Sequence, residues 1–183
     1  MIDASVAKRS SFAVWVLIVC SASAALIARQ TVSSVAAHIL LYVILAGVCL
    51  AMSSRDQAAA PVAPAIALSI GITALLATRL FPGTVLPLRG GAVLVTLGLL
   101  AAVAEEAFFR QFIYSRVAQR SVPLAVVASA LLFGLLHLPS YGWAAFPLDL
   151  GAGFLLSWQR WASGRWEVPA ATHAAANLLA MIR

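Results

Sequence analysis

Seven long runs of apolar residues, separated by short polar or Pro- and Gly-containing stretches, make up most of the chain. They cover residues 12–28, 35–52, 62–78, 91–114, 122–138, 143–158 and 168–182. A helix needs about 20 residues to cross about 30 Å of hydrocarbon, and the runs approach that length. The pattern predicts an all-α, polytopic membrane protein with about six to seven transmembrane helices.

The fourth run differs from the others because it continues into an amphipathic stretch. It contains no Gly or Pro after Gly98 and carries Arg116 and Arg120 at its far end. This predicts one long helix over residues 91–119, partly in lipid and partly emerging.

Prolines mark the expected ends of the following helix. Pro123 is expected at its start and Pro139 just beyond its end. Residues 139–147 are interrupted by Pro and Gly, so we expect a loop or a re-entrant piece there. The first run follows a basic pair and is expected to be a retained span, with a cleaved signal peptide as the alternative.

Composition supports the membrane prediction. The 183 residues are 63% hydrophobic and 10% charged, whereas soluble domains average about 45–50% and about 25%. The net charge of +6 does not indicate nucleic-acid binding, because the basic residues are spread singly between apolar runs. No repeat or linker is present, so residues 1–183 are expected to form a single domain.

The basic residues also predict an orientation, since cytoplasmic loops carry an excess of Lys and Arg. With the N-terminus in the cytoplasm, that side collects Lys8, Arg9, Arg55, Arg116, Arg120, Arg160 and Arg165. The other side then holds Arg29, Arg79, Arg89 and Arg183. Cys20 and Cys49 both lie in apolar runs, so neither a disulfide framework nor a zinc-ligand spacing is indicated.

Two adjacent carboxylates, Glu105 and Glu106, lie in the middle of the fourth run, although the whole chain has only six acidic residues. A charged side chain at the centre of a membrane helix costs about 2.5–3.5 kcal/mol on insertion scales. An ionisable group at this depth is therefore a functional-site hypothesis by default. A purely structural, ion-paired anchor is the alternative.

Helical spacing assigns the two glutamates different directions. Glu106 and Arg110 are four residues apart with the acid first, which is the better orientation for an ion pair. Adjacent helical residues point about 100° apart, so Glu105 faces elsewhere. We expect Glu106 to pair with Arg110 and Glu105 to be left facing a cavity.

Two further pairs share helical faces: Phe133 with His137, and His173 with Asn177. Counted from the turn between the fourth and fifth runs, Glu105 and His137 lie about 22 and 25 Å along antiparallel helices and are therefore level. His173 lies only about 12 Å beyond the turn at Arg165. For Glu105, His137 and His173 to meet, the turn at Arg120 must therefore project about 10 Å beyond the turn at Arg165.

A carboxylate, two imidazoles and an amide suit hydrolysis of an acyl bond. Glu105 could act as a general base on water, and His137 could bind the same water or a metal. His173 and Asn177 could donate hydrogen bonds to the developing oxyanion, although they could equally serve helix packing. No Ser or Cys accompanies the set as an obvious nucleophile, which favours activated water.

The three motifs, Glu105-Glu106-x-x-x-Arg110, Phe133-x-x-x-His137 and His173-x-x-x-Asn177, together resemble the CPBP (Abi) family of intramembrane proteases, which includes the type II CAAX prenyl endopeptidases. The resemblance covers residues 91–182, which would form the catalytic core.

The resemblance implies a peptidase whose polar cavity opens into the bilayer. Its catalytic residues would be Glu105, His137, His173 and Asn177, with Glu106, Arg110 and Phe133 in support. No cofactor is expected to be obligatory, and zinc, if bound, would take Glu105, His137 and His173 as ligands.

The expected partners are a membrane-anchored protein or peptide substrate and the lipid bilayer. The expected location is the bacterial inner membrane, with the N-terminus in the cytoplasm. Two alternatives remain: a proton-coupled transporter that uses the same groups as a relay, and a non-catalytic immunity or interaction protein. The lack of matching broken helices in the two halves disfavours the transporter.

Overall fold

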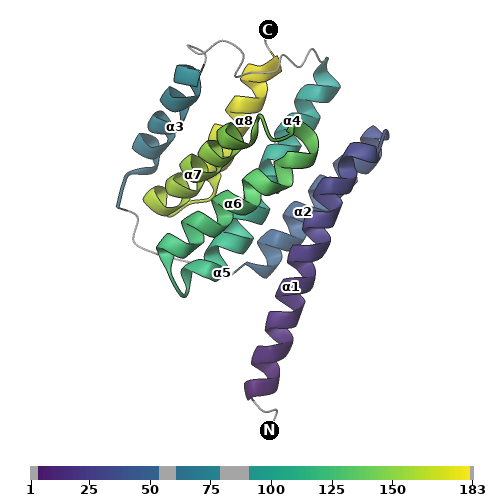
Figure 1. The fold of residues 1–183 in the computed structure, drawn as a ribbon, viewed down its shortest axis with the longest axis vertical. Helices are drawn as coiled ribbons and strands as arrows, with labels where there is room; N and C mark the ends of the chain where they lie inside the picture. Colours follow the sequence, from purple (N-terminus) through teal and green to yellow (C-terminus); the bar gives the residue numbers. More distant parts are fainter. Residues whose placement is uncertain (1–3, 54–60, 79–90, 182–183) are drawn as a thin grey trace.

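The computed structural model describes residues 4–53, 61–78 and 91–181, and within them it contains helices and no strands (Figure 1). In chain order the elements are α1 (Ala4–Ala28), η1 (Arg29–Thr31), α2 (Val35–Met52), α3 (Pro64–Thr78), α4 (Ala92–Glu106), η2 (Ala107–Ile113), α5 (Tyr114–Ala118), α6 (Val122–Tyr141), α7 (Phe146–Ser163) and α8 (Glu167–Met181). The predicted all-α class is confirmed.

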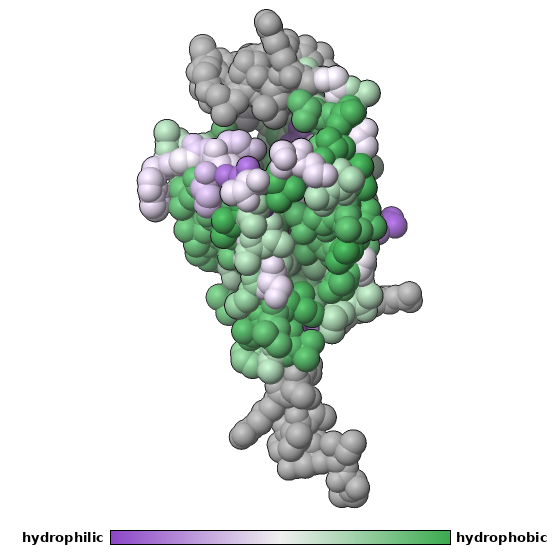
Figure 2. All heavy atoms as spheres, turned by 90° about the vertical axis from the view of Figure 1, so that its right-hand side faces the viewer, coloured by the Kyte–Doolittle hydropathy of each residue, from purple (hydrophilic) through white to green (hydrophobic). Residues whose placement is uncertain are grey.

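Four helical stretches are long and apolar enough to cross a membrane: Phe12–Thr31, Val35–Met52, Ala92–Ala118 and Val122–Tyr141. The apolar α3 is shorter, at 15 residues. Large aliphatic side chains of α1 and α2 are exposed, and apolar residues cover much of the face that these helices present (Figure 2). Such a surface fits contact with lipid.

The fourth apolar run forms one continuous rod of α4, η2 and α5, as predicted, but its middle section is a π-helix. There the Tyr114 N–H donates to the carbonyl of Phe109, five residues back. Two carbonyls of this section also accept bonds from neighbouring helices, from Ser129 Oγ to Phe109 at 3.0 Å and from Arg160 Nε to Arg110 at 3.1 Å. π-Helical turns are frequent at functional sites.

The prediction for Pro123 is confirmed and the one for Pro139 is wrong. Pro123 lies in the first turn of α6, but the helix continues through Pro139 to Tyr141. Proline lacks the N–H that would bond the carbonyl four residues back, and its ring crowds that carbonyl. Pro139 nevertheless lies in the last turn of α6, whose end is held by the Gly142 N–H on Leu138 O at 2.8 Å. Because α7 begins at Phe146, the expected loop or re-entrant piece is reduced to a short turn.

The helices that build the interior are α2, α4, α6, α7 and α8, with α1 at one edge and α3 at the opposite edge (Figure 1). α6 packs along α7, and α4 packs against α2 and α8. The approach of α6 to α7 is close at Gly153, where an added Cβ would lie 2.8 Å from the carbonyl oxygen of Ala130.

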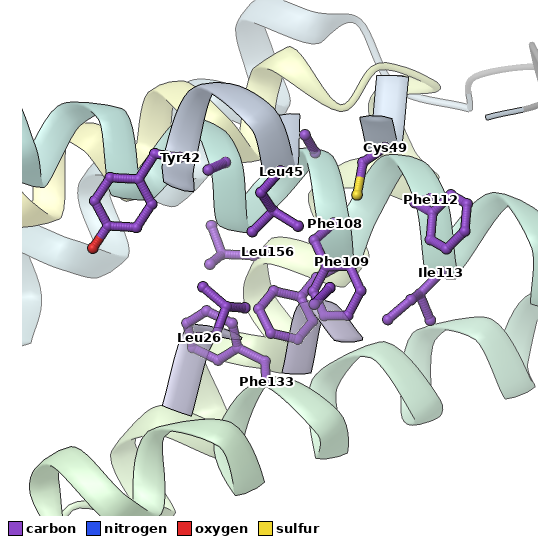
Figure 3. Close-up of a cluster of buried hydrophobic side chains, with 13 residues drawn as sticks. Leu26, Tyr42, Leu45, Cys49, Phe108, Phe109, Phe112, Ile113, Phe133 and Leu156 are labelled. Carbon is purple, nitrogen blue, oxygen red and sulfur yellow. The ribbon is translucent and has the colours of Figure 1, made fainter. Parts of the chain in front are cut away.

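The largest apolar core surrounds the π-helical section (Figure 3). Phe108 and Phe109 are fully buried, and Leu45 and Cys49 of α2 pack against the same cluster. Leu26 of α1 also reaches it. This packing fixes the rod just past the two glutamates, so the direction of their side chains is set by the core.

Two basic residues used to predict orientation are not loop charges. Arg29 and Arg160 both have buried or nearly buried side chains that bind groups inside the bundle. Each side of the predicted topology therefore loses one charge. Arg55, Arg79, Arg89, Arg183 and the final residue of the proposed core, Ile182, lie outside the described residues.

Candidate active site

The predicted ion pair between Glu106 and Arg110 is present on the rod of α4, η2 and α5, and it is completely buried. Arg110 Nη1 donates to Glu106 Oε1 at 2.9 Å, and both side chains are 0% exposed. Arg110 Nη2 also donates to the carbonyl of Gly153 at 3.1 Å, and its guanidinium lies 4.6 Å from the centroid of the Phe133 ring. Arg110 thus joins the rod to both α6 and α7.

Glu106 has a second partner that sequence reasoning did not predict. His173 Nδ1 lies 2.9 Å from the same oxygen, Glu106 Oε1. A carboxylate oxygen accepts, so Nδ1 carries the proton, and the Nε2 of a neutral His173 is then an acceptor. Glu106 therefore fixes the orientation of a histidine as well as the position of Arg110.

Glu105 points toward both histidines. Its Oε2 lies 3.6 Å from His137 Nε2 and 4.0 Å from His173 Nε2. His137 Nδ1 lies 2.8 Å from the carbonyl oxygen of Phe133, so this ring also directs an unprotonated Nε2 at Glu105 when neutral. No group in the described ranges hydrogen-bonds Glu105 Oε2, although this atom is buried.

Helices α4, α6 and α8 bring Glu105, His137 and His173 to the same depth in the bundle. Glu105 and His137 are level, as their spacing along α4 and α6 predicted. His173 on α8 joins them, and the turn between α5 and α6 extends beyond the turn between α7 and α8 (Figure 1).

The remaining oxygen of Glu105 is held by a residue that sequence reasoning missed. Arg29, in η1, forms an ion pair through Nη1 with Glu105 Oε1. Glu105 faces the two histidines, but the prediction that it is left without an ion-pair partner is wrong, because Arg29 binds its other oxygen. In the sequence Arg29 follows an apolar run and is typical of a loop charge, and nothing in its spacing links it to Glu105.

Aromatic rings hold the histidines. The Phe133 ring lies 4.2 Å from the His137 ring and 5.7 Å from the His173 ring, centroid to centroid. Tyr141 stacks on the other side of His137 at 5.7 Å. Phe133 therefore contacts both imidazoles, while the contact of Tyr141 was not expected because Pro139 was predicted to lie beyond the end of the helix.

Asn177 lies on the same helix as His173 and ties it to α4. Its Nδ2 donates to the carbonyl of Gly98 at 2.8 Å. An amide nitrogen carries two N–H groups, and this bond uses one. Asn177 therefore holds α8 beside the rod that carries the glutamates.

Zinc, if bound, was expected to take Glu105, His137 and His173 as ligands. Across the described ranges, no group of three His, Cys, Asp or Glu side chains is arranged to hold a metal. Glu105 already has a cation on Oε1, since Arg29 binds it there, and a second cation beside the same carboxylate would meet that charge. Water and the side chains carry the chemistry proposed below.

The fold and the buried cluster define a helical membrane protein with an ionisable site inside its bundle. Residues 87–179, just over half of the chain, match the family model described as type II CAAX prenyl endopeptidase Rce1-like. The chain belongs to this family, which confirms the family inferred from the motifs. Neither the search of curated proteins nor the search of solved structures returned a match.

Membership in this family makes the protein an intramembrane peptidase of the CAAX type and gives it a membrane-associated protein as substrate class. Together with the four apolar helices it also makes the chain an integral membrane protein.

Proposed function

We propose that the protein is an endopeptidase that hydrolyses a peptide bond near the membrane anchor of its substrate, with Glu105 as the base that activates water. The observation that carries the proposal is the placement of Glu105 Oε2, buried and directed at Nε2 of both His137 and His173. Three acceptor atoms facing one point suit the binding of a water molecule through its two protons.

The distances leave room for that water. Hydrogen bonds to oxygen are typically about 2.5–3.2 Å long, so Glu105 Oε2 and His137 Nε2, at 3.6 Å, are too far apart for a direct bond. A water oxygen beside this pair can lie within hydrogen-bonding distance of both atoms. General-base catalysis by a positioned side chain contributes about 10²–10⁴-fold to a rate.

In the proposed reaction the water oxygen bonds to the carbonyl carbon while one of its protons moves to Glu105 Oε2. The carbonyl oxygen takes the electron pair and becomes an oxyanion. The C–N bond then breaks, and the proton on Glu105 passes to the leaving nitrogen. The products are a carboxylic acid terminus and an amine, between which one proton can then pass, and Glu105 returns to its starting state.

For the oxyanion we propose Asn177 and His173 as donors, with different requirements. Asn177 has a second N–H beyond the one that binds Gly98. His173 donates from Nε2 only as an imidazolium, because its Nδ1 proton is already given to Glu106. Removal of one oxyanion donor from a hydrolase typically costs about 10²–10³-fold in kcat.

The experiment is cleavage in reconstituted vesicles. The reporters are peptides of one sequence, anchored either by a prenylated C-terminal Cys motif or by a transmembrane segment, and the products are identified by mass. Wild type should cleave at one bond near an anchor. Glu105→Gln and His137→Ala should fold and insert but lose cleavage, and the control Arg120→Ala, an exposed arginine at the α5–α6 turn, should retain it. Cleavage retained by Glu105→Gln would overturn the mechanism.

We also propose that the N-terminus is cytoplasmic and that the protein resides in a bacterial inner membrane. The support is the excess of basic residues on the cytoplasmic side, which persists after Arg29 and Arg160 are removed from the count. Labelling of single cysteines placed at residues 8 and 120 should report the cytoplasmic side, and labelling from outside would reverse the assignment.

A further inference from the structure

Arg29 brings the N-terminal helix into the candidate site, although it lies outside the residues that match the family. Its guanidinium pairs with Glu105 across 76 positions of sequence, while the family match begins at residue 87. The Arg29 side chain is 14% exposed and the Glu105 side chain 4%. The pair is therefore part of the interior, where an uncompensated charge is strongly unfavourable.

The short turn η1 is held in place from two sides. Gln30 Nε2 donates to Ser140 Oγ at 2.6 Å, which ties the turn to the end of α6. On the other side His38 Nε2 lies 3.1 Å from the carbonyl oxygen of Arg29, which ties it to α2. The Tyr42 ring, also on α2, lies 6.0 Å below the guanidinium. The side chain of Arg29 thus extends from a fixed backbone.

The pairing determines which oxygen of Glu105 faces the histidines. Arg29 occupies Oε1, and Oε2 is left directed at His137 and His173 at 3.6 and 4.0 Å. Without Arg29, rotation of the carboxylate would let it accept the Nε2–H of a histidine in its imidazolium form directly, at the usual distance of about 2.7–3.2 Å. The space for a water molecule between the base and the histidines would then close.

We propose that Arg29 is a positioning residue for the hydrolysis, which acts by holding Glu105 Oε1 so that Oε2 stays withdrawn from the two imidazoles. The inference rests on the proposed function of Glu105. It makes the N-terminal helix a component of the active site, so the family segment alone does not contain the whole site.

The kinetic test compares Arg29→Met, Arg29→Lys and Arg29→Ala with Arg120→Ala, using the reporter that wild type cleaves. Arg29→Met should lower kcat about 100-fold, the lower limit of what general-base catalysis contributes, with KM changed less than threefold. Arg29→Lys should retain more activity than Arg29→Met, because it keeps a cation. Equal kcat in wild type and Arg29→Met would overturn the proposal.

Chemical rescue separates positioning from a general structural role. A cleft of about 240 Å³ between α1 and α2 is lined by Arg29, His38 and apolar residues, so methylguanidinium has a route to the position of the deleted side chain. It should raise kcat of Arg29→Ala at least tenfold and leave Arg29→Met, whose side chain fills the space, unchanged. An equal effect on both variants would contradict a positioning role.

A second measurement does not depend on cleavage. In detergent, the unfolding temperatures of Arg29→Met, Glu105→Gln and the double variant form a double-mutant cycle. Each single variant leaves one charge unpaired, whereas the double variant leaves none. The unfolding temperature of the double variant should therefore fall by less than the sum of the decreases in the two single variants. Additive losses would show that the ion pair is absent and would overturn the inference. Coupling without cleavage by wild type would instead contradict the proposed function.

Discussion

Replacing Gly153 by alanine should force α6 and α7 apart. The new Cβ would lie 2.8 Å from the carbonyl oxygen of Ala130 and 3.0 Å from its Cα. Both are backbone atoms, so no side-chain rotation relieves the contact. Gly151, two residues earlier on α7, has nothing within 4 Å of the same added atom and provides a matched control.

The magnitude follows from comparing the two glycines. An alanine in a helix interior is more favourable than glycine by about 0.8–1.0 kcal/mol, and this gain is shared by both variants and cancels. Overpacking of a close contact costs about 1–3 kcal/mol. Gly153→Ala should therefore be about 1–3 kcal/mol less stable than Gly151→Ala.

The displacement should also reach the candidate site. The carbonyl of Gly153 accepts a bond from Arg110, which in turn holds Glu106, and Glu106 holds His173. Gly153→Ala should accordingly reduce the cleavage rate of a reporter as well as stability, whereas Gly151→Ala should change neither adversely.

The assay uses the buried thiol of Cys49, which is 0% exposed and packs in the main core (Figure 3). In a Cys20→Ser background, a thiol-reactive fluorogenic dye reports unfolding when Cys49 becomes accessible. For a chain of this size 1 kcal/mol corresponds to about 2–4 °C, so Gly153→Ala should unfold about 2–12 °C below Gly151→Ala. Equal unfolding temperatures for the two variants would refute the close packing of α6 on α7.

Three further outcomes are expected. Glu106→Gln should lower stability by about 3–5 kcal/mol in the same dye assay, because it leaves the buried charge of Arg110 without its partner; a loss below 1 kcal/mol would contradict the buried pair. Incubation of active protein with a strong zinc chelator should leave cleavage unchanged, since the proposed mechanism assigns the activation of water to Glu105; loss of activity restored by zinc would reverse this. Gln159→Met should cost about 1–3 kcal/mol and speed amide exchange in α3, because Gln159 Nε2 donates to the carbonyl of Ala67 and to Thr172; unchanged exchange in α3 would contradict this role.

The spacing of residues along the sequence predicted two kinds of contact in the site: contacts between residues of one helix, and contacts between residues at equal depth on neighbouring helices. The four-residue interval placed Glu106 on Arg110, and counting from a turn made Glu105 level with His137. The contact between His173 and Glu106 was missed, because it depends on how α8 is rotated against α4. Rotation about a helix axis is set by packing across the whole interface, and the spacing of motifs does not record it.

Arg29 and the π-helical section were missed for different physical reasons. Arg29 follows an apolar run at a position where a topogenic loop charge is the usual interpretation, so only the fold reveals its partner. The π-helical section contains no Gly or Pro that would signal an irregularity. It is stabilised by Ser129 and Arg160, side chains of other helices that bind its carbonyls. Pro139 gave the opposite error, since one missing N–H near a helix end does not stop the helix.

Glu105 with Arg29, and Glu106 with Arg110, form two ion pairs in the interior, and the formal charges of these four groups sum to zero when both histidines are neutral. When Asn177 alone donates to the oxyanion and His173 stays neutral, the proton released by water stays on Glu105 while the substrate oxygen becomes negative, so the sum is still zero at the tetrahedral intermediate. It is zero again once the proton has left with the amine. Because a net charge in a medium of low dielectric constant is strongly unfavourable, such a cluster can complete the hydrolysis at bilayer depth without drawing an ion from either aqueous side.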